Sequence, residues 1–139
     1  MTMMQKQLYD KDCFLCCLVM ATSIPYNEAA EKWGYDLVAH VADNGLIGRE
    51  YVIQAFEKLG LIMDVDYKVL YLSLDWGSVG FTKNMLWGRR ACLQIKSKNY
   101  RDKFHIVYWD GQELFDPSNK LTYIWEEVEP IYIWLFNER

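Results

Sequence analysis

QLYDKDCFLCCLVM, residues Gln7 to Met20, changes abruptly from polar to apolar at Cys13. Asp12 is a favourable helix N-cap, because a carboxylate there accepts hydrogen bonds from the free N–H groups of the first helical turn. The run from Cys13 to Ala21 is almost entirely apolar, as in a helix that is buried on all sides. The stretch therefore predicts a buried helix that begins at Cys13, and the rest of the chain is expected to pack around it.

Cys13 is the candidate nucleophile of this helix. A thiol in the first turn lies at the positive end of the helix dipole, which favours the reactive thiolate. A purely structural cysteine is the alternative, because cysteine is often buried and inert. Cys16 and Cys17 follow on the next helical turn, and packing is their simplest role.

Length and composition limit the class of protein. The 139 residues fit one domain, residues 1–139, and 52% of them are hydrophobic, which is enough for a real core. The net charge of −4 and the lack of a basic stripe argue against a nucleic-acid partner. The longest apolar run is shorter than the roughly 20 residues that span a bilayer, so we expect no membrane insertion. Four cysteines, three of them crowded into one helical turn, suit free thiols in a reducing, cytoplasmic location.

The periodicity of the remaining chain predicts helices first and strands afterwards. Further helices are expected at Glu28–Trp33, ended by Gly34, and at Arg49–Leu59, ended by Gly60. Extended segments are expected at 61–74, 91–95, 104–109, 113–115 and 131–136. Helices followed by an antiparallel sheet indicate an α+β fold.

A thiolate nucleophile needs a base, and the chain has two histidines. His40 lies in an irregular stretch with no orienting group beside it, so a surface or capping role is expected for it. His105 opens the strand Phe104–Trp109 and is the candidate base.

Asp116 is the candidate orienting group for His105. Asp110-Gly111 is the residue pair preferred in a two-residue type I′ hairpin turn. Such a turn places Trp109 opposite Gln112 and Asp116 opposite His105, on one face of the sheet. The alternative is a hydrogen-bonded core histidine and an Asp-Pro turn with no catalytic role.

These residues together resemble the papain-like bacteriocin-processing peptidases, the double-glycine leader peptidase family. The resemblance rests on Gln7 six residues before Cys13, on Cys17, and on the segments Phe104-His-Ile-Val and Phe115-Asp-Pro117. It implies a papain-like fold, a peptide or protein substrate, and no metal or organic cofactor. The implied roles are an oxyanion donor for Gln7, the nucleophile for Cys13, the base for His105 and the orienting carboxylate for Asp116.

The chain departs from this family after the nucleophile. Phe14 stands where the family usually has glycine, and its ring is expected to narrow the approach to Cys13 or to line a substrate-binding pocket. The family's peptidase domain is commonly the front end of a membrane exporter. Without a transporter in this sequence, the domain is expected to act alone or with a separate protein partner.

Four alternatives draw on parts of the sequence. Cys13-Phe-Leu-Cys16 is a C-x-x-C motif, which suggests a thiol oxidoreductase, although the β-strand that normally precedes such a motif is not evident. A zinc site built with Cys92 or His105 lacks paired ligand spacing. A cysteine amidase or acyl transferase would use the same acyl-enzyme chemistry. A non-catalytic binding module on the same fold would use tryptophans as anchors, with candidates at Trp76, Trp87, Trp109, Trp125 and Trp134.

Overall fold

In the described part of the chain the helices α1, α2 and α4 precede the sheet strands, so helices and strands are segregated along the sequence, as is typical of the α+β class. The structure, a computed structural model, describes residues 4–8, 12–34, 47–68, 86–96, 104–117, 122–123 and 130–138. Within these ranges the elements are α1 (Cys13–Thr22), α2 (Tyr26–Trp33), α4 (Arg49–Lys58), β1 (Leu61–Lys68), β2 (Ala91–Lys96), β3 (Phe104–Trp109), β4 (Leu114–Phe115), β5 (Thr122–Tyr123) and β6 (Pro130–Glu138). The predicted α+β class is confirmed.

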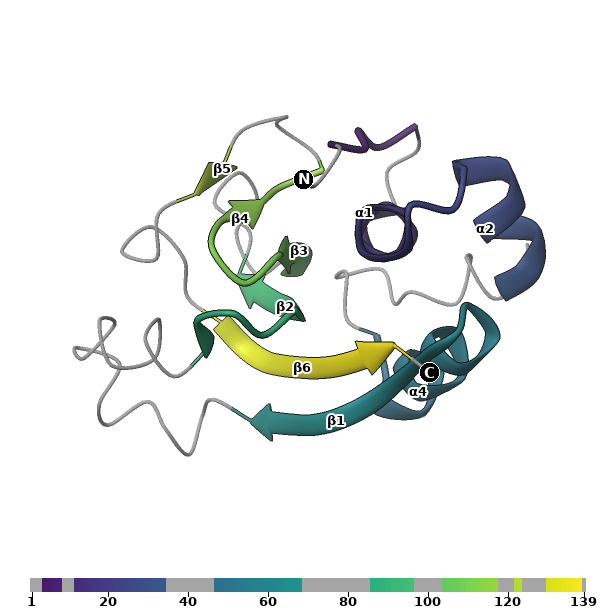
Figure 1. Cartoon of the computed structure of the whole chain (residues 1–139). Helices are drawn as coiled ribbons and strands as arrows, with labels where there is room; N and C mark the ends of the chain where they lie inside the picture. Colours follow the sequence, from purple (N-terminus) through teal and green to yellow (C-terminus); the bar gives the residue numbers. More distant parts are fainter. Residues whose placement is uncertain are drawn as a thin grey trace.

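The six strands form one antiparallel sheet in the order β1-β6-β2-β3-β4-β5. The C-terminal strand β6 therefore lies between β1 and β2, and its pairing joins segments that are far apart in the sequence. The sheet curves around α1, which is seen nearly end-on in Figure 1. A register shift between Met63 and Val65 places Asp64 at an irregularity in β1.

The helices form as their sequences predict, with small changes at their ends. α2 begins at Tyr26, two residues before the predicted start, and ends at Trp33; its C-cap is Gly34, whose φ of 108° suits glycine. α1 and α2 meet at a bend of 112°. Among the described residues no single helix is long and apolar enough to cross a membrane; only this bent pair, taken together, meets the length and composition required.

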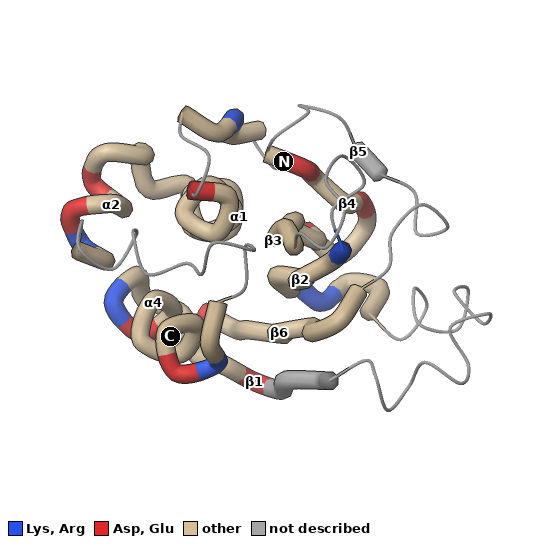
Figure 2. The backbone as a smooth tube through the Cα atoms, turned by 180° about the vertical axis from the view of Figure 1, so that it is seen from behind, with Lys and Arg blue, Asp and Glu red and all other residues tan. Residues whose placement is uncertain are grey.

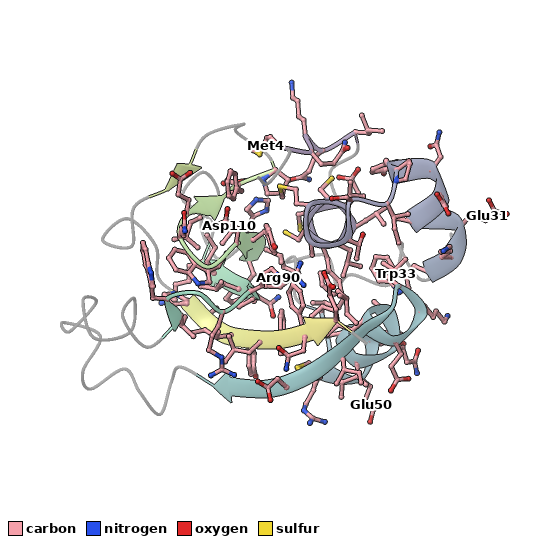
Figure 3. All side chains as sticks on the ribbon, in the orientation of Figure 1. Met4, Glu31, Trp33, Glu50, Arg90 and Asp110 are labelled. Carbon is pink, nitrogen blue, oxygen red and sulfur yellow. The ribbon has the colours of Figure 1, made fainter. Side chains whose placement is uncertain are left out.

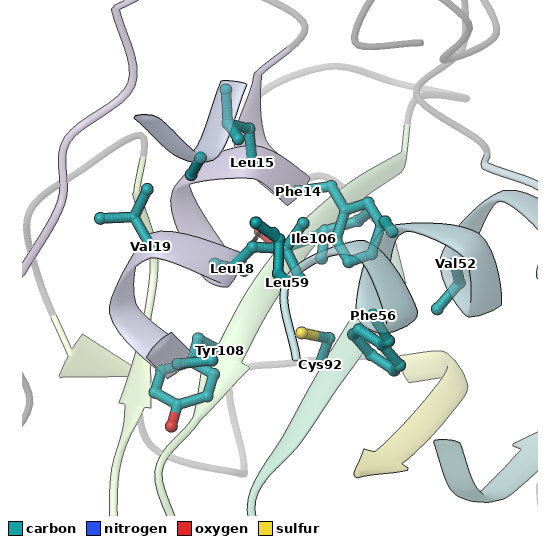
Figure 4. Packing of buried hydrophobic residues seen from close by; sticks show 14 of the residues in the cluster. Phe14, Leu15, Leu18, Val19, Val52, Phe56, Leu59, Cys92, Ile106 and Tyr108 are labelled. Atoms are coloured by element: carbon teal, nitrogen blue, oxygen red, sulfur yellow. Dashed lines mark hydrogen bonds between the residues drawn. The ribbon is translucent and has the colours of Figure 1, made fainter. Parts of the chain in front are cut away.

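All residues of α1 from Cys13 to Ala21 are buried, as the apolar run predicts. Its side chains pack between the sheet and the other two helices (Figure 4). Trp33 of α2 lies beside α4 (Figure 3), and the ammonium group of Lys58 donates a 3.0 Å hydrogen bond to its carbonyl oxygen. The first helix is therefore enclosed by core residues. Acidic and basic residues are interspersed along α2 and α4 (Figure 2).

The β3–β4 hairpin forms, but the predicted two-residue turn is wrong. Trp109 pairs with Leu114 and Tyr108 with Phe115, so residues 110–113 form a four-residue loop. The cause is Asp110, whose Oδ1 accepts hydrogen bonds of 2.8 Å from the backbone N–H groups of Gln112 and Glu113. This side chain to backbone bonding closes the loop two residues later than a type I′ turn would.

Candidate active site

Cys13 is the first residue of α1, and only 4% of it is exposed. The predicted N-cap bond is absent: no N–H group of the first turn is capped by the Asp12 side chain. The Asp12 carboxylate is instead engaged by the backbone N–H of Leu8, at 3.0 Å, and by the hydroxyl of Tyr26, at 2.7 Å. The first turn of α1 therefore keeps backbone N–H groups that its neighbouring carboxylate does not occupy.

His105 and Asp116 meet as predicted, although by a different register. The ring Nε2 of His105 lies 2.6 Å from Asp116 Oδ1. Continuing the observed pairing places Asp116 beside Val107, two positions from His105. A shift of two residues keeps both side chains on the same face of the sheet, because strand side chains alternate with a period of two. The pair is therefore diagonal rather than directly opposite.

The surroundings of His105 favour its protonated form. Burial alone lowers the pKa of His105, but hydrogen bonds to Asp116 and Cys13, together with the charges of both groups, raise it to about 10. The His105 side chain is 16% exposed and the Asp116 side chain only 2%. Because Nε2 is engaged by Asp116, the other ring nitrogen, Nδ1, is left for Cys13. The imidazole thus lies between the thiol and the carboxylate.

A contact on the next turn of α1 explains why Cys13 and His105 are close. The Cys17 thiol donates a 3.5 Å hydrogen bond to the carbonyl oxygen of Ile106, the residue that follows His105. This bond holds α1 against β3.

Burial raises the pKa of Cys17 well above its usual value, with hydrogen bonding to Cys92 as a further cause. Burial likewise raises the pKa of Cys16, helped by the nearby charges of Asp12 and Cys13. Cys16 and Cys17 are therefore neutral thiols at ordinary pH.

Gln7 reaches the same region through its backbone. Its N–H donates a 2.9 Å hydrogen bond to the carbonyl oxygen of Pro117, the residue after Asp116. The side chain is half-buried, and its oxygen Oε1 is fully covered. The segment that carries Gln7 is thus tied to the chain that carries Asp116. All four residues assigned from the sequence, Gln7, Cys13, His105 and Asp116, belong to segments that these contacts join.

Phe14 does not line a substrate pocket, contrary to the expectation. Its side chain has no exposed surface. Its ring packs edge-on against Trp33 with 5.3 Å between ring centroids, and against Phe56 at 6.0 Å; a third ring, that of Trp134, lies at 6.4 Å. These partners come from α2, α4 and β6, so Phe14 is a core residue.

The described residues bear on some features of the alternatives. All four cysteines are free, and no strand precedes Cys13 in the described residues 4–8 and 12, so the C-x-x-C motif lacks its usual context. No group of three or more His, Cys, Asp or Glu side chains in the described part of the chain is placed to hold a metal. Trp109 and Trp134 are buried and Trp87 is 55% exposed, while His40, Trp76 and Trp125 lie outside the described residues.

Sequence reasoning missed the contacts of Asp12. No local signal links it to Tyr26, because the two residues are 14 positions apart: Asp12 precedes α1 and Tyr26 begins α2. The Gln7 to Pro117 hydrogen bond gave no local signal either, since it joins residues 110 positions apart in the sequence. The sequence offers one indication of such contacts. A carboxylate next to an apolar run must find hydrogen-bond donors once it is buried.

No protein-family model matches the chain, and no curated protein matches it in sequence. The functional interpretation therefore rests on the residues and contacts described above.

Proposed function

We propose that this protein is a papain-like cysteine peptidase with Cys13 as nucleophile, His105 as acid and base, and Asp116 as the orienting carboxylate. The carrying observation is the position of His105, hydrogen-bonded through Nε2 to buried Asp116 at 2.6 Å while it also interacts with Cys13. Support for a papain-like arrangement comes from a nucleophile that begins the first helix and from a base and carboxylate on the antiparallel sheet that packs against it.

The first half of the reaction forms an acyl-enzyme. The Cys13 thiolate attacks the carbonyl carbon of the scissile bond, and the π electrons of that bond move to oxygen. The developing oxyanion accepts hydrogen bonds from the backbone N–H of Cys13 and from the side-chain amide of Gln7, each donor contributing about 10²- to 10³-fold in rate. The C–N bond then breaks as the protonated His105 transfers its proton to the leaving amine.

The second half regenerates the thiolate. Neutral His105 removes a proton from water, and the resulting hydroxide attacks the thioester carbonyl. The C–S bond breaks, the acid product leaves, and Cys13 returns as a thiolate beside the protonated imidazole. Asp116 compensates the positive charge of His105 in both halves and keeps its Nδ1 directed at the sulfur. A different acceptor in place of water would convert the same intermediate into an acyl-transfer product.

Selective alkylation tests the nucleophile. Iodoacetamide at pH 6 is expected to label Cys13 at least tenfold faster than Cys16, Cys17 or Cys92, because the protonated imidazole of His105 interacts with Cys13. The labelled position is mapped by mass spectrometry, and His105→Ala is expected to remove the advantage. Equal labelling of Cys13 and Cys92, or labelling of Cys13 that ignores His105, would contradict the proposal.

Hydrolysis tests the reaction itself. A mixture of unstructured peptides is incubated with the parent chain and with Cys13→Ala, and new N-termini are identified by mass spectrometry. Cleavage by the parent that disappears in Cys13→Ala is expected. If Cys13 is reactive but no peptide is cleaved, the proposal of a peptidase is lost and an amidase or acyl transferase becomes the better description.

A further inference from the structure

Gln7 and Leu8 are anchored to opposite sides of the proposed site. The backbone N–H of Gln7 donates to the carbonyl oxygen of Pro117 at 2.9 Å, on the side that carries Asp116. The backbone N–H of Leu8 donates to Asp12 Oδ2 at 3.0 Å, on the side that carries Cys13. Two adjacent residues of a segment without regular secondary structure are thus fixed from two directions.

The Asp12 carboxylate that holds Leu8 is buried and accepts a further hydrogen bond. The residue is 1% exposed. The same oxygen, Oδ2, also accepts a 2.7 Å hydrogen bond from the hydroxyl of Tyr26, the first residue of α2. A buried carboxylate is stabilised by such charge-assisted bonds and is costly without them. Tyr26 therefore sets the orientation in which Asp12 meets Leu8.

We propose that Asp12 and Tyr26 are positioning residues for oxyanion stabilisation, acting through Leu8 to hold the Gln7 amide beside Cys13. The inference rests on the proposed function, because it assigns Gln7 to the oxyanion of that reaction. The contacts that carry this role are those that Asp12 Oδ2 accepts from the Leu8 N–H and the Tyr26 hydroxyl. Their role is to tie the short Gln7 segment to the two helices, so that the donor keeps its distance from the nucleophile.

The inference predicts a selective kinetic defect. A misplacement of about 1 Å in a catalytic group costs on the order of 10²-fold in rate, so Tyr26→Phe is expected to lower kcat by about 10- to 100-fold, with a smaller change in KM. Alkylation of Cys13 by iodoacetamide forms no oxyanion, and its rate is expected to stay within twofold of the parent. A merely structural defect would slow both reactions.

The experiment compares Tyr26→Phe, Gln7→Ala and the double variant. Hydrolysis of p-nitrophenyl acetate, corrected with Cys13→Ala, reports oxyanion stabilisation, and Tyr51→Phe in α4 serves as the matched control. We expect the double variant to be no slower than Gln7→Ala, because both changes remove the same donor. Multiplying defects, a proportional loss of alkylation, or an unchanged kcat in Tyr26→Phe would overturn the inference.

A second measurement separates this inference from the proposed function. Hydrogen exchange of the Leu8 amide is expected to accelerate at least tenfold in Tyr26→Phe and to remain unchanged in Tyr51→Phe. Acceleration in a parent chain that hydrolyses nothing would support the anchor and refute only the proposed reaction. Unchanged Leu8 exchange would overturn the anchor whatever the hydrolysis data show. Asp12→Asn keeps an acceptor oxygen, so it is expected to retain more Leu8 protection than Asp12→Ala.

Discussion

Replacing His105 by glutamine should remove a pH-dependent part of the stability of this protein. The fold raises the pKa of His105 from its usual 6.5 to about 10, because the favourable interactions with Asp116 and Cys13 outweigh the cost of burial. A raised pKa means that the folded state binds the proton more tightly than the unfolded state. The stabilisation is therefore fully present below pH 6.5 and is lost as pH rises through about 10.

The size of the effect follows from the same pKa. Each pKa unit corresponds to about 1.4 kcal/mol, so the whole change corresponds to about 5 kcal/mol in favour of the imidazolium. Between pH 6 and pH 8.5 the expected loss is roughly 2 to 3 kcal/mol. The window ends at pH 8.5 because Cys16 and Cys17, whose pKa values are also raised by burial, begin to lose their own contributions near their usual pKa of 9.0.

Urea unfolding followed by tryptophan fluorescence at pH 6 and pH 8.5 measures this loss. The parent is expected to lose roughly 2 to 3 kcal/mol of unfolding free energy over the window, and His105→Gln at most a third of that. Asp116→Asn should fall between them, because an amide accepts a hydrogen bond but carries no charge. If the parent and His105→Gln show the same pH dependence, the protonated imidazole contributes nothing to stability and the argument from its contacts is wrong.

Further substitutions test the core, the glycine turns and a surface ion pair. Phe14→Ala is expected to lower the unfolding free energy by about 3 to 5 kcal/mol in urea titrations, because the ring is fully buried among three aromatic partners. Gly111→Ala should destabilise more than Gly60→Ala in thermal unfolding: both have positive φ, but a Cβ at Gly111 would approach the Gly88 backbone to 3.2 Å, while nothing lies within 4 Å at Gly60. Arg89→Ala should change the unfolding free energy by less than about 1 kcal/mol, because its ion pair with Asp64 is solvent-exposed.

The parts of the fold that depend on local pattern could be predicted from the sequence. The uninterrupted apolar run identified α1, and spaced apolar residues identified α4, because burial acts on each helix through its own side chains. The place of β6 between β1 and β2 could not be predicted. Strand order depends on contacts between distant segments, and no single strand sequence specifies its partners.

The contact between His105 and Asp116 was predicted correctly from a hairpin turn that was predicted wrongly. Asp110-Gly111 suggested a two-residue turn, whereas the Asp110 side chain closes a four-residue loop. The error of two residues preserved the face of the strand, so His105 and Asp116 still meet. An error of one residue would have separated them. Asp12 failed as a predicted cap because a tertiary partner, Tyr26, competes for its carboxylate.

On the proposed mechanism, two different kinds of support hold the reacting groups. Cys13 and His105 lie on a buried helix and a sheet strand, and the Cys17 to Ile106 hydrogen bond fixes one against the other. Side chains on such elements are held by the core itself.

Gln7, by contrast, lies on a segment without regular structure. The backbone hydrogen bonds of Gln7 and Leu8, rather than core packing, hold this segment in position. Substitutions that weaken one support or the other should therefore have different effects on the rates of alkylation and hydrolysis. A cavity under α1, as in Leu18→Ala, moves the nucleophile relative to its base and should slow alkylation and hydrolysis together. Loss of the Tyr26 hydroxyl should slow hydrolysis alone. Because the thiol and the oxyanion donor depend on different contacts, the ratio of these two rates reports which support has failed.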